Sequence, residues 1–328
     1  MTWLITGGAG FIGAHVVRAM LDAGERVAVY DDLSTGDPAR VPDGVTFVKG
    51  SVLDPDLLRS TLTELGVSGI VHLAAKKQVG ESVERPLYYY RENVEGLRTL
   101  LEAAGDAHVR HFLFSSSAAV YGMPDVNLVT EDTDCSPVNP YGETKLAGER
   151  LVRAAGRAHG MTTACLRYFN VAGAADEQLA DSGVFNLVPM VFEKLTQGEA
   201  PMIFGDDYDT ADGTCVRDFI HVQDIASAHL AAARALTTRE PGRDLTVNIG
   251  RGEGVSVREM IALIGEVTGY GDRAAPVSAP RRAGDPARVV ASADRIRDEL
   301  GWTARHGVRA MVESAWAGWC RRHPEARR

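Results

Sequence analysis

Two side chains, Tyr141 and Lys145, have the types and the spacing for acid–base chemistry. They lie in Asn139-Pro140-Tyr141-Gly-Glu-Thr-Lys145, four residues apart, at the start of a helix predicted to run to about Ala158, and therefore share one helical face. A tyrosine hydroxyl has an unperturbed pKa of about 10, so it is a poor base near neutrality unless a cation stabilises its phenolate. Lys145 is placed to supply that cation. The pair predicts a tyrosine that takes a proton from a substrate hydroxyl.

A third candidate catalytic residue is Ser117, the last of the serines Ser115-Ser116-Ser117 that follow the apolar run Phe112–Phe114. Its hydroxyl could bridge the substrate and the phenolate. A tyrosine and a lysine four residues apart are by themselves a weak signal, because surface helices often carry both. The prediction therefore depends on the elements that would hold these groups.

The chain begins with a strand, a glycine turn and a helix. Trp3-Leu4-Ile5 is a buried-strand run, and Phe11–Met20 carries apolar residues at helical spacing. Between them, Gly7 allows a tight turn, Gly10 lets the backbone approach a pyrophosphate, and Gly13 lets the helix pack on the strand. The spacing is G-x-x-G-x-x-G rather than the more familiar G-x-G-x-x-G. This stretch predicts the floor of a dinucleotide site.

The acids Asp31 and Asp32 follow the second predicted strand, Arg26–Tyr30. A carboxylate at Asp31 can accept hydrogen bonds from the adenosine ribose and would repel a 2'-phosphate, which favours NAD over NADP. The positive nicotinamide of NAD would help Lys145 to lower the pKa of Tyr141. The small residues Ala74 and Ala75 would let the backbone pass close to this cofactor.

Strand and helix patterns alternate along the chain, which predicts an α/β fold: a doubly wound, Rossmann-like parallel sheet with a smaller α/β substrate-binding lobe. We expect an NAD-binding domain over 1–170 with a return segment at 216–250, and a substrate-binding lobe over 171–215 and 251–328. The predicted strands are Val45–Val48, Gly69–Leu73, Phe112–Phe114, Cys165–Phe169, Met202–Phe204 and Leu245–Ile249. The predicted helices are Asp54–Leu65, Tyr88–Ala104, Phe185–Gln197, Phe219–Ala235, Val255–Thr268 and Ala293–Leu300, the last two in the smaller lobe.

Composition narrows the class of protein. The formal net charge of -9 opposes nucleic-acid binding, which needs a basic surface. No apolar run is long enough to span a bilayer and no signal peptide is expected, so we expect a cytoplasmic protein without membrane partners. The four cysteines are scattered without C-x-x-C spacing, and the acidic loop Asp207–Gly213 lacks the EF-hand pattern, so no metal site is predicted.

Several motifs together resemble a known family. Thr6–Gly13, Ser115–Gly122 and Tyr141–Lys145 are similar to the extended short-chain dehydrogenase/reductase family. Val79-Gly-Glu-Ser-Val83, Arg167-Tyr-Phe-Asn170 and the long motif from Gly205 to Val222 narrow the resemblance to the UDP-glucose 4-epimerases in that family, and it runs almost end to end.

The resemblance implies which residues bind the two ligands, with Ser117, Tyr141 and Lys145 as the catalytic residues. The implied NAD-binding residues are Gly7, Gly10, Phe11, Ile12, Gly13, Asp31, Asp32, Ser51, Val52, Leu73, Ala74, Ala75, Lys77, Asn93, Tyr141, Lys145 and Phe169. The implied UDP-sugar-binding residues are Ser117, Tyr141, Asn170, Asn186, Phe204, Arg217, Val289, Arg282 and Asp285. The two arginines would suit the pyrophosphate, although Arg281 adjoins Arg282 and the assignment could shift by one residue.

The resemblance also implies an activity and an assembly. UDP-glucose and UDP-galactose would be interconverted by oxidation at C4, rotation of the 4-keto sugar and re-reduction, in a homodimer. Val289, without a tyrosine ring, would leave room for UDP-N-acetylhexosamines.

The sequence departs from the family pattern in three places. Ser51 replaces a usual aspartate, Ala119 replaces a threonine of some members, and the loop after Ala174 is short.

Two other functions are weighed against this one. A nucleotide-sugar 4,6-dehydratase would need an extra acid and base just after Ser117, where this chain has Ala118 and Ala119, neither of which can transfer a proton. A catalytically silent dinucleotide-sensing protein would have no need of Ser117, Tyr141 and Lys145 together.

Overall fold

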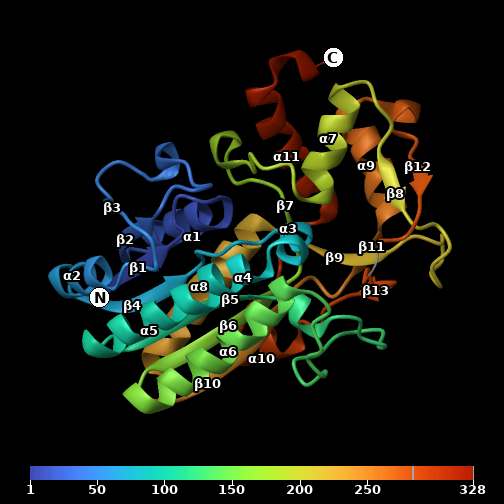
Figure 1. Cartoon of the computed structure of the whole chain (residues 1–328). Coiled ribbons are helices and arrows are strands. Elements are labelled where there is room, and N and C mark those ends of the chain that lie inside the picture. Colours follow the sequence, from blue (N-terminus) through green and yellow to red (C-terminus); the bar gives the residue numbers. More distant parts are fainter. Residues whose placement is uncertain (283, 328) are drawn as a thin grey trace.

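The computed structural model describes residues 1–282 and 284–327. Its main sheet has seven strands in the order β10-β6-β5-β4-β1-β2-β3, and every neighbouring pair is parallel (Figure 1). The strands are β1 (Thr2–Thr6), β2 (Arg26–Asp31), β3 (Thr46–Lys49), β4 (Val67–His72), β5 (His111–Ser117), β6 (Thr162–Tyr168) and β10 (Asp244–Ile249). The order reverses between β1 and β4, where a doubly wound sheet binds its ligands. The predicted fold class is confirmed.

Helices cover both faces of this sheet. Successive residues of a strand point to opposite faces, so Trp3 and Ile5 lie in one core while Leu4 lies in the other. The first core is closed by α1 (Phe11–Asp22), α8 (Val222–Thr238) and α10 (Asp294–Leu300), and the second by α2 (Pro55–Glu64), α5 (Gly96–Asp106) and α6 (Pro140–His159). The two covered faces leave the carboxyl ends of the strands as the open edge for a site.

Helix α6 begins and packs in a way that places Tyr141 at this edge. Asn139 caps it by accepting a hydrogen bond from the Gly142 N–H at 2.9 Å, and Pro140 occupies the first turn. Gly148 brings the helix close to β5, because a Cβ there would stand 2.6 Å from the Phe114 ring. Local capping thus sets where α6 starts, and a glycine sets how near it lies to the sheet.

The predicted helix Tyr88–Ala104 exists but is not uniform. The chain runs through α3 (Val79–Glu84) and α4 (Pro86–Tyr89) into a π-helical segment, Tyr90–Glu95, and then α5. Asn93 lies in the π-helical turn, where its amide accepts from the Lys76 N–H at 2.8 Å and donates to the Lys76 carbonyl at 2.9 Å. Single π turns often mark functional sites. Here the turn directs an amide at the segment after β4.

A second lobe is built around a four-stranded sheet of β11-β9-β13, with β7 pairing to β9. Its strands are β7 (Asn170–Ala172), β9 (Val216–His221), β11 (Gly254–Ser256) and β13 (Arg288–Val289), beside the pair β8 (Met202–Phe204) and β12 (Val277–Ala279). Its helices are α7 (Leu187–Thr196), α9 (Val257–Thr268) and α11 (Val308–Arg322), which share a third hydrophobic core. The sequence analysis did not predict α11.

Two sequence predictions around this lobe need correction. Phe219–Ala235 is not helical throughout, because Phe219 pairs with Asn170 as part of β9 and the helix begins only at Val222. Helix α10 packs on α8 and β10, with Ile296 buried in the core beneath the main sheet rather than in the lobe. Of the return segment 216–250, β10 joins the main sheet and β9 the smaller one. The exact domain boundaries stay a prediction.

Candidate active site

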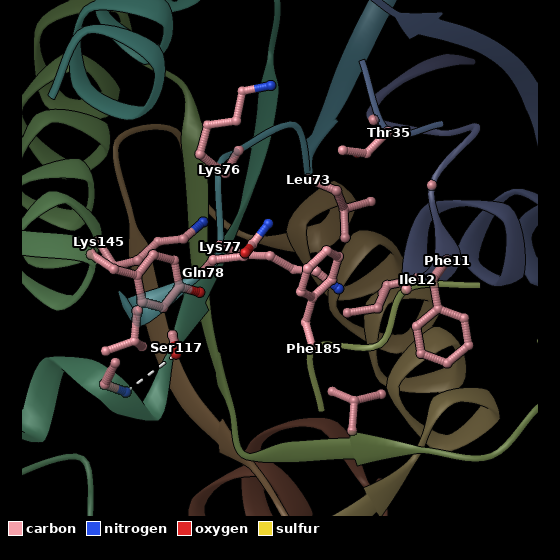
Figure 2. Close-up of a pocket in the computed structure, with 18 of the residues that line it drawn as sticks. Phe11, Ile12, Thr35, Leu73, Lys76, Lys77, Gln78, Ser117, Lys145 and Phe185 are labelled. Carbon is pink, nitrogen blue, oxygen red and sulfur yellow. Dashed lines mark hydrogen bonds between the residues drawn. The ribbon is translucent and has the colours of Figure 1, made fainter. Parts of the chain in front are cut away.

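A pocket of about 590 Å³ opens at the carboxyl ends of the main-sheet strands and extends to the second lobe. Figure 2 shows Ser117 and Lys145 on one side of it and Phe11, Ile12 and Leu73 on the other. The N-terminal turns of α1 and α6 both reach it, as does β13 from the lobe. One cavity therefore brings together the predicted dinucleotide turn and the predicted acid–base residues.

The glycine turn has the close geometry that a dinucleotide site needs. Gly7 has a φ of +71°, which favours glycine, and a Cβ at Gly13 would lie 2.0 Å from the Gly7 carbonyl oxygen. Helix α1 starts at Phe11, and no described side chain caps it at Gly10. Its first N–H groups and the positive end of its dipole therefore face the pocket, where an anion is stabilised. The turn fits the pyrophosphate of a dinucleotide.

Asp31 ends β2 and is held firmly at the rim of the pocket. Its carboxylate accepts hydrogen bonds from the Ala9 N–H at 3.0 Å and the Leu33 N–H at 2.9 Å. Burial raises the pKa of Asp31, while these two hydrogen bonds act in the opposite direction. Lys76, a cation at the same rim, donates to the Ser34 hydroxyl at 2.8 Å. The carboxylate is thus oriented before any ligand arrives.

The structure brings Ser117, Tyr141 and Lys145 together in this pocket. The Lys145 ammonium donates to the Ser115 carbonyl at 2.8 Å and lies 5.9 Å from the centre of the Tyr141 ring. Burial lowers the pKa of Lys145 to about 8. Burial also raises the pKa of the Tyr141 hydroxyl, and a hydrogen bond with Ser117 opposes that rise. Burial outweighs this hydrogen bond, so the expected lowering of the Tyr141 pKa needs a further positive charge.

Most of the predicted binding residues line the pocket. Those that do are Gly7, Gly10, Phe11, Ile12, Gly13, Asp31, Asp32, Val52, Leu73, Ala74, Ala75, Lys77, Ser117, Tyr141, Lys145, Phe169, Asn170, Asn186, Arg217, Asp285 and Val289. Arg217 pairs with Asp285, and its other arm donates to the Val216 carbonyl. The lobe thus presents a guanidinium to the cavity, already oriented by a carboxylate.

Four predicted residues are not among the described residues that line the pocket: Ser51, Asn93, Phe204 and Arg282. The Ser51 carbonyl accepts from the Tyr30 hydroxyl at 2.9 Å, while its neighbours Gly50 and Val52 face the cavity. Asn93 is hydrogen-bonded to the backbone of Lys76, which does line the pocket. The Arg282 guanidinium lies over the Phe204 ring at 3.6 Å. Phe204 and Arg282 are therefore brought together with each other, beside the pocket rather than in its wall.

The pocket also has wall residues that the sequence analysis missed, among them Arg40, Lys76, Gln78, Tyr168, Asp181 and Phe185. Tyr168 could have been found, since it lies inside the motif Arg167-Tyr-Phe-Asn170 and its hydroxyl contacts the Ser115 hydroxyl. Arg40 reaches across to donate to the Ala180 carbonyl at 2.8 Å. Arg40 and Ala180 are 140 positions apart in the chain, so their contact leaves no local signal in the sequence.

Comparisons with known proteins agree with this geometry. Residues 3–250 match the NAD dependent epimerase/dehydratase family. A UDP-glucose 4-epimerase of Halalkalibacterium halodurans is 42% identical over 99% of this chain and 97% of its own length, and one of Streptomyces lividans is 43% identical over 98% and 97%. A solved UDP-glucose-4-epimerase from Stenotrophomonas maltophila, with bound NAD and formylated UDP-arabinopyranose, has a TM-score of 0.93 at 37% identity over 99% of each chain. The UDP-Glc/GlcNAc 4-epimerase from Campylobacter jejuni has a TM-score of 0.84 at 37% identity over 97% and 99%.

Proposed function

Because the chain belongs to the NAD dependent epimerase/dehydratase family, we propose that it is an isomerase that interconverts UDP-glucose and UDP-galactose with NAD as its cofactor. The observation that carries the proposal is one pocket lined by the Gly7–Gly13 turn, by Tyr141 and Lys145, and by Arg217 of the lobe. The turn suits NAD because the N-terminus of α1 reaches the pocket without a cap from any described side chain and can receive a pyrophosphate, while Gly13 lets α1 pack against the Gly7 carbonyl. When bound, NAD accepts a hydride from the sugar and later returns it.

The side chains of the pocket do the remaining work. The Tyr141 phenolate removes the proton of the sugar 4'-hydroxyl, directly or through Ser117, and later returns a proton. Lys145 stabilises the phenolate, since an ammonium favours the charged form of a nearby phenol. Arg217 offers a planar guanidinium to the diphosphate. The diphosphate would replace Asp285 as the ion-pair partner of Arg217. The sugar is free to rotate because it is held through its diphosphate.

The purified protein tests this proposal directly. We expect it to interconvert UDP-glucose and UDP-galactose without added cofactor and to release NAD on denaturation, since a cofactor regenerated in each cycle need not leave. Absence of interconversion even with added NAD would rule the activity out. Recovery of NADP alone would contradict the role given to Asp31.

A nucleotide-sugar 4,6-dehydratase remains the less supported alternative. Ala118 and Ala119 line the pocket directly after Ser117. A methyl side chain can neither donate nor accept a proton, so the elimination of water would have no acid and base at this position.

The protonation of Tyr141 should respond to the cofactor. Its pKa is raised by burial in the cofactor-free protein, so we expect it to be mostly protonated at neutral pH. A positive nicotinamide ring nearby favours the phenolate, so we expect the phenolate to form at lower pH when NAD is bound. Titration of the phenolate absorbance, with Tyr141→Phe subtracted as the control, measures both values. An equal or higher pKa with NAD would contradict the proposed activation.

The wall of the sugar site should decide whether a 2-acetamido group fits. Val289 is buried in β13 and faces the pocket without an aromatic ring. We therefore propose that UDP-N-acetylglucosamine is also epimerised, and that Val289→Tyr reduces kcat/KM for it by roughly 5- to 150-fold relative to UDP-glucose, which corresponds to an overpacking cost of about 1 to 3 kcal/mol. Steady-state kinetics with both sugars measure the ratio. An unchanged ratio would show that Val289 is not the gate.

An exposed apolar strip supports the proposal of a homodimer. Val83 on α3, Leu87 on α4 and the adjoining Tyr90 are exposed, and Leu87 is 83% exposed. Burying such a strip against a second copy would remove apolar surface from water. We expect a dimer in sedimentation experiments and mostly monomer for Leu87→Lys. The control is Val277→Lys, an exposed apolar site on the other lobe, and dissociation by both variants alike would argue against this face.

We also propose a cytoplasmic location. All four cysteines, Cys135, Cys165, Cys215 and Cys320, are free thiols, as is usual in a reducing compartment. Among the described residues, no helix has both the length and the apolar character needed to cross a membrane.

A further inference from the structure

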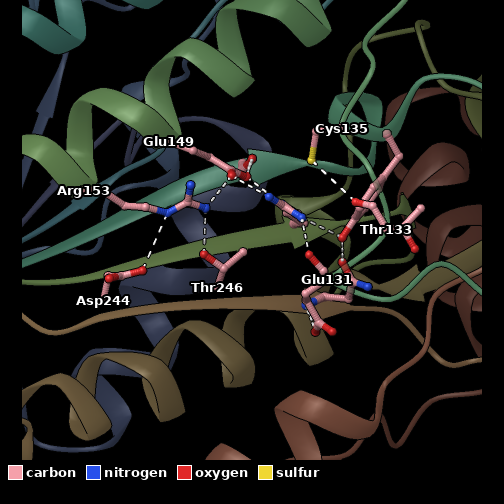
Figure 3. Close-up of polar contacts among 11 residues, drawn as sticks. Glu131, Thr133, Cys135, Glu149, Arg153, Asp244 and Thr246 are labelled. Carbon is pink, nitrogen blue, oxygen red and sulfur yellow. Dashed lines mark hydrogen bonds and ion pairs between the residues drawn. The ribbon is translucent and has the colours of Figure 1, made fainter.

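A buried ion pair between Glu149 and Arg167 lies along α6 beyond the acid–base residues. The Glu149 side chain is 0% exposed and that of Arg167 is 4% exposed. Two parallel hydrogen bonds join them, from Arg167 Nε to Glu149 Oε1 and from Arg167 Nη2 to Glu149 Oε2, each 2.7 Å long. Figure 3 shows Glu149 within this polar cluster, with Arg153 to its left. None of the chemistry proposed above uses the pair.

The pair is connected to each element that carries a catalytic group. Glu149 is four residues after Lys145 and eight after Tyr141, so the three side chains share one face of α6. Glu149 Oε1 accepts from the Ser116 hydroxyl at 2.6 Å. Ser116 sits between Ser115, whose carbonyl accepts from Lys145, and Ser117. Two adjacent residues of β5 thus hold two adjacent turns of α6.

The opposite side of Arg167 holds the segment that follows Ser117. Arg167 Nη1 donates to the Tyr121 hydroxyl at 2.9 Å, and Tyr121 belongs to the short 3₁₀ helix Ala118–Tyr121 directly after β5. The Tyr121 hydroxyl in turn donates to Asn248 Oδ1 on β10 at 2.6 Å. The end of β5 is therefore fixed from both sides, by α6 and by β10.

The carboxylate of Glu149 is well satisfied. Arg153 adds a hydrogen bond to Oε2 at 2.8 Å. Burial alone would raise the pKa of Glu149, but the hydrogen bonds and charge of Arg167, with the Ser116 hydroxyl and Arg153, hold it below its usual value. Buried ion pairs rarely add stability over well-packed apolar side chains, because both charges must be desolvated. Their hydrogen bonds do restrict geometry, which gives a reason for such a pair beside α6.

We propose that Glu149 and Arg167 are positioning residues, which fix α6 against the end of β5 so that Tyr141, Lys145 and Ser117 meet the sugar hydroxyl in one geometry. The proposal rests on the function proposed above. Reacting groups must be aligned closely, and a displacement of about 1 Å can lower a rate by about 10²-fold. If the ion pair is weakened, the cofactor turn and Arg217 should stay in place while the distance between Tyr141 and Ser117 increases.

The test replaces the two-pronged contact and measures kcat separately from KM. Arg167→Lys keeps the positive charge but loses the planar fork. We expect kcat to fall by about 10²-fold with KM and bound NAD nearly unchanged. We also expect the acid limb of the kcat–pH profile to move to higher pH, because the Tyr141 phenolate loses part of its stabilisation. The matched control is Arg153→Gln. Arg153 is half-buried, donates to the same Glu149 carboxylate and also donates to Thr246 of β10. We expect this variant to leave kcat unchanged.

A second arm separates positioning from stability. The double variant Glu149→Leu, Arg167→Met removes both charges, so no unpaired charge stays buried, and it should fold and keep NAD while losing kcat to a similar extent. If either replacement of Arg167 fails to fold, Ser116→Ala carries the test with a smaller expected loss of kcat. Normal kcat and an unshifted pH profile in the folded variants would overturn the proposal, whatever their melting temperatures. An inactive wild type would instead overturn the proposed function.

Discussion

Tyr141→Phe should fold, retain NAD and lose about 10²- to 10⁴-fold in kcat, the usual contribution of a general acid–base group. The phenyl ring fills the same space, so the packing at the start of α6 is kept. The hydroxyl that faces Ser117 is lost, and with it the only proton acceptor that the proposed mechanism provides for the sugar hydroxyl. Steady-state epimerisation and release of the cofactor on denaturation measure the two effects separately.

A tyrosine outside the pocket provides the control. Tyr90 lies in the π-helical segment, and its hydroxyl bonds to Glu143 at 2.7 Å. Tyr90→Phe removes a hydroxyl of the same kind, and we expect normal turnover. Near-normal turnover by Tyr141→Phe would refute the assignment of Tyr141 as the base, while loss of NAD from that variant would point to a binding role instead.

Gly13→Ala should yield a protein without NAD and therefore without activity. The added Cβ would stand 2.0 Å from the Gly7 carbonyl oxygen and 2.8 Å from Gly8 Cα, and both neighbours are backbone atoms of the turn itself. The conflict can be relieved only if α1 moves away from the turn that we propose receives the pyrophosphate. Absorbance and denaturation assays of the purified variant report the bound cofactor.

Gly307→Ala is the matched control, because none of the described atoms lies within 4 Å of a Cβ built there. We expect it to keep NAD and activity. Circular dichroism and thermal melting show whether Gly13→Ala is folded. A folded Gly13→Ala protein with a full complement of NAD would contradict the role given to the turn.

Much of the secondary structure could be predicted from the sequence because it depends on residues that are near one another in the chain. The strand, glycine turn and helix from Thr2 to Asp22 depend on residues that are neighbours in the chain. The shared face of Tyr141 and Lys145 follows from helical periodicity alone. Phe219–Ala235 was partly wrong because a short apolar run suits a strand or a helix equally, and the pairing of β9 with β7 decided between them.

The amino-acid sequence by itself determined the class of fold, the glycine turn that opens α1, the acid at the end of β2 and the helical face shared by Tyr141 and Lys145, since each is set by residue type and short spacing. Only the tertiary structure decided which groups share the cavity. It placed Arg282 over Phe204 beside the pocket and brought Arg40 across to Ala180. It also raised the pKa of Tyr141 by burial. Stacking, burial and desolvation depend on segments far apart in the chain, so they exist only once the chain has packed.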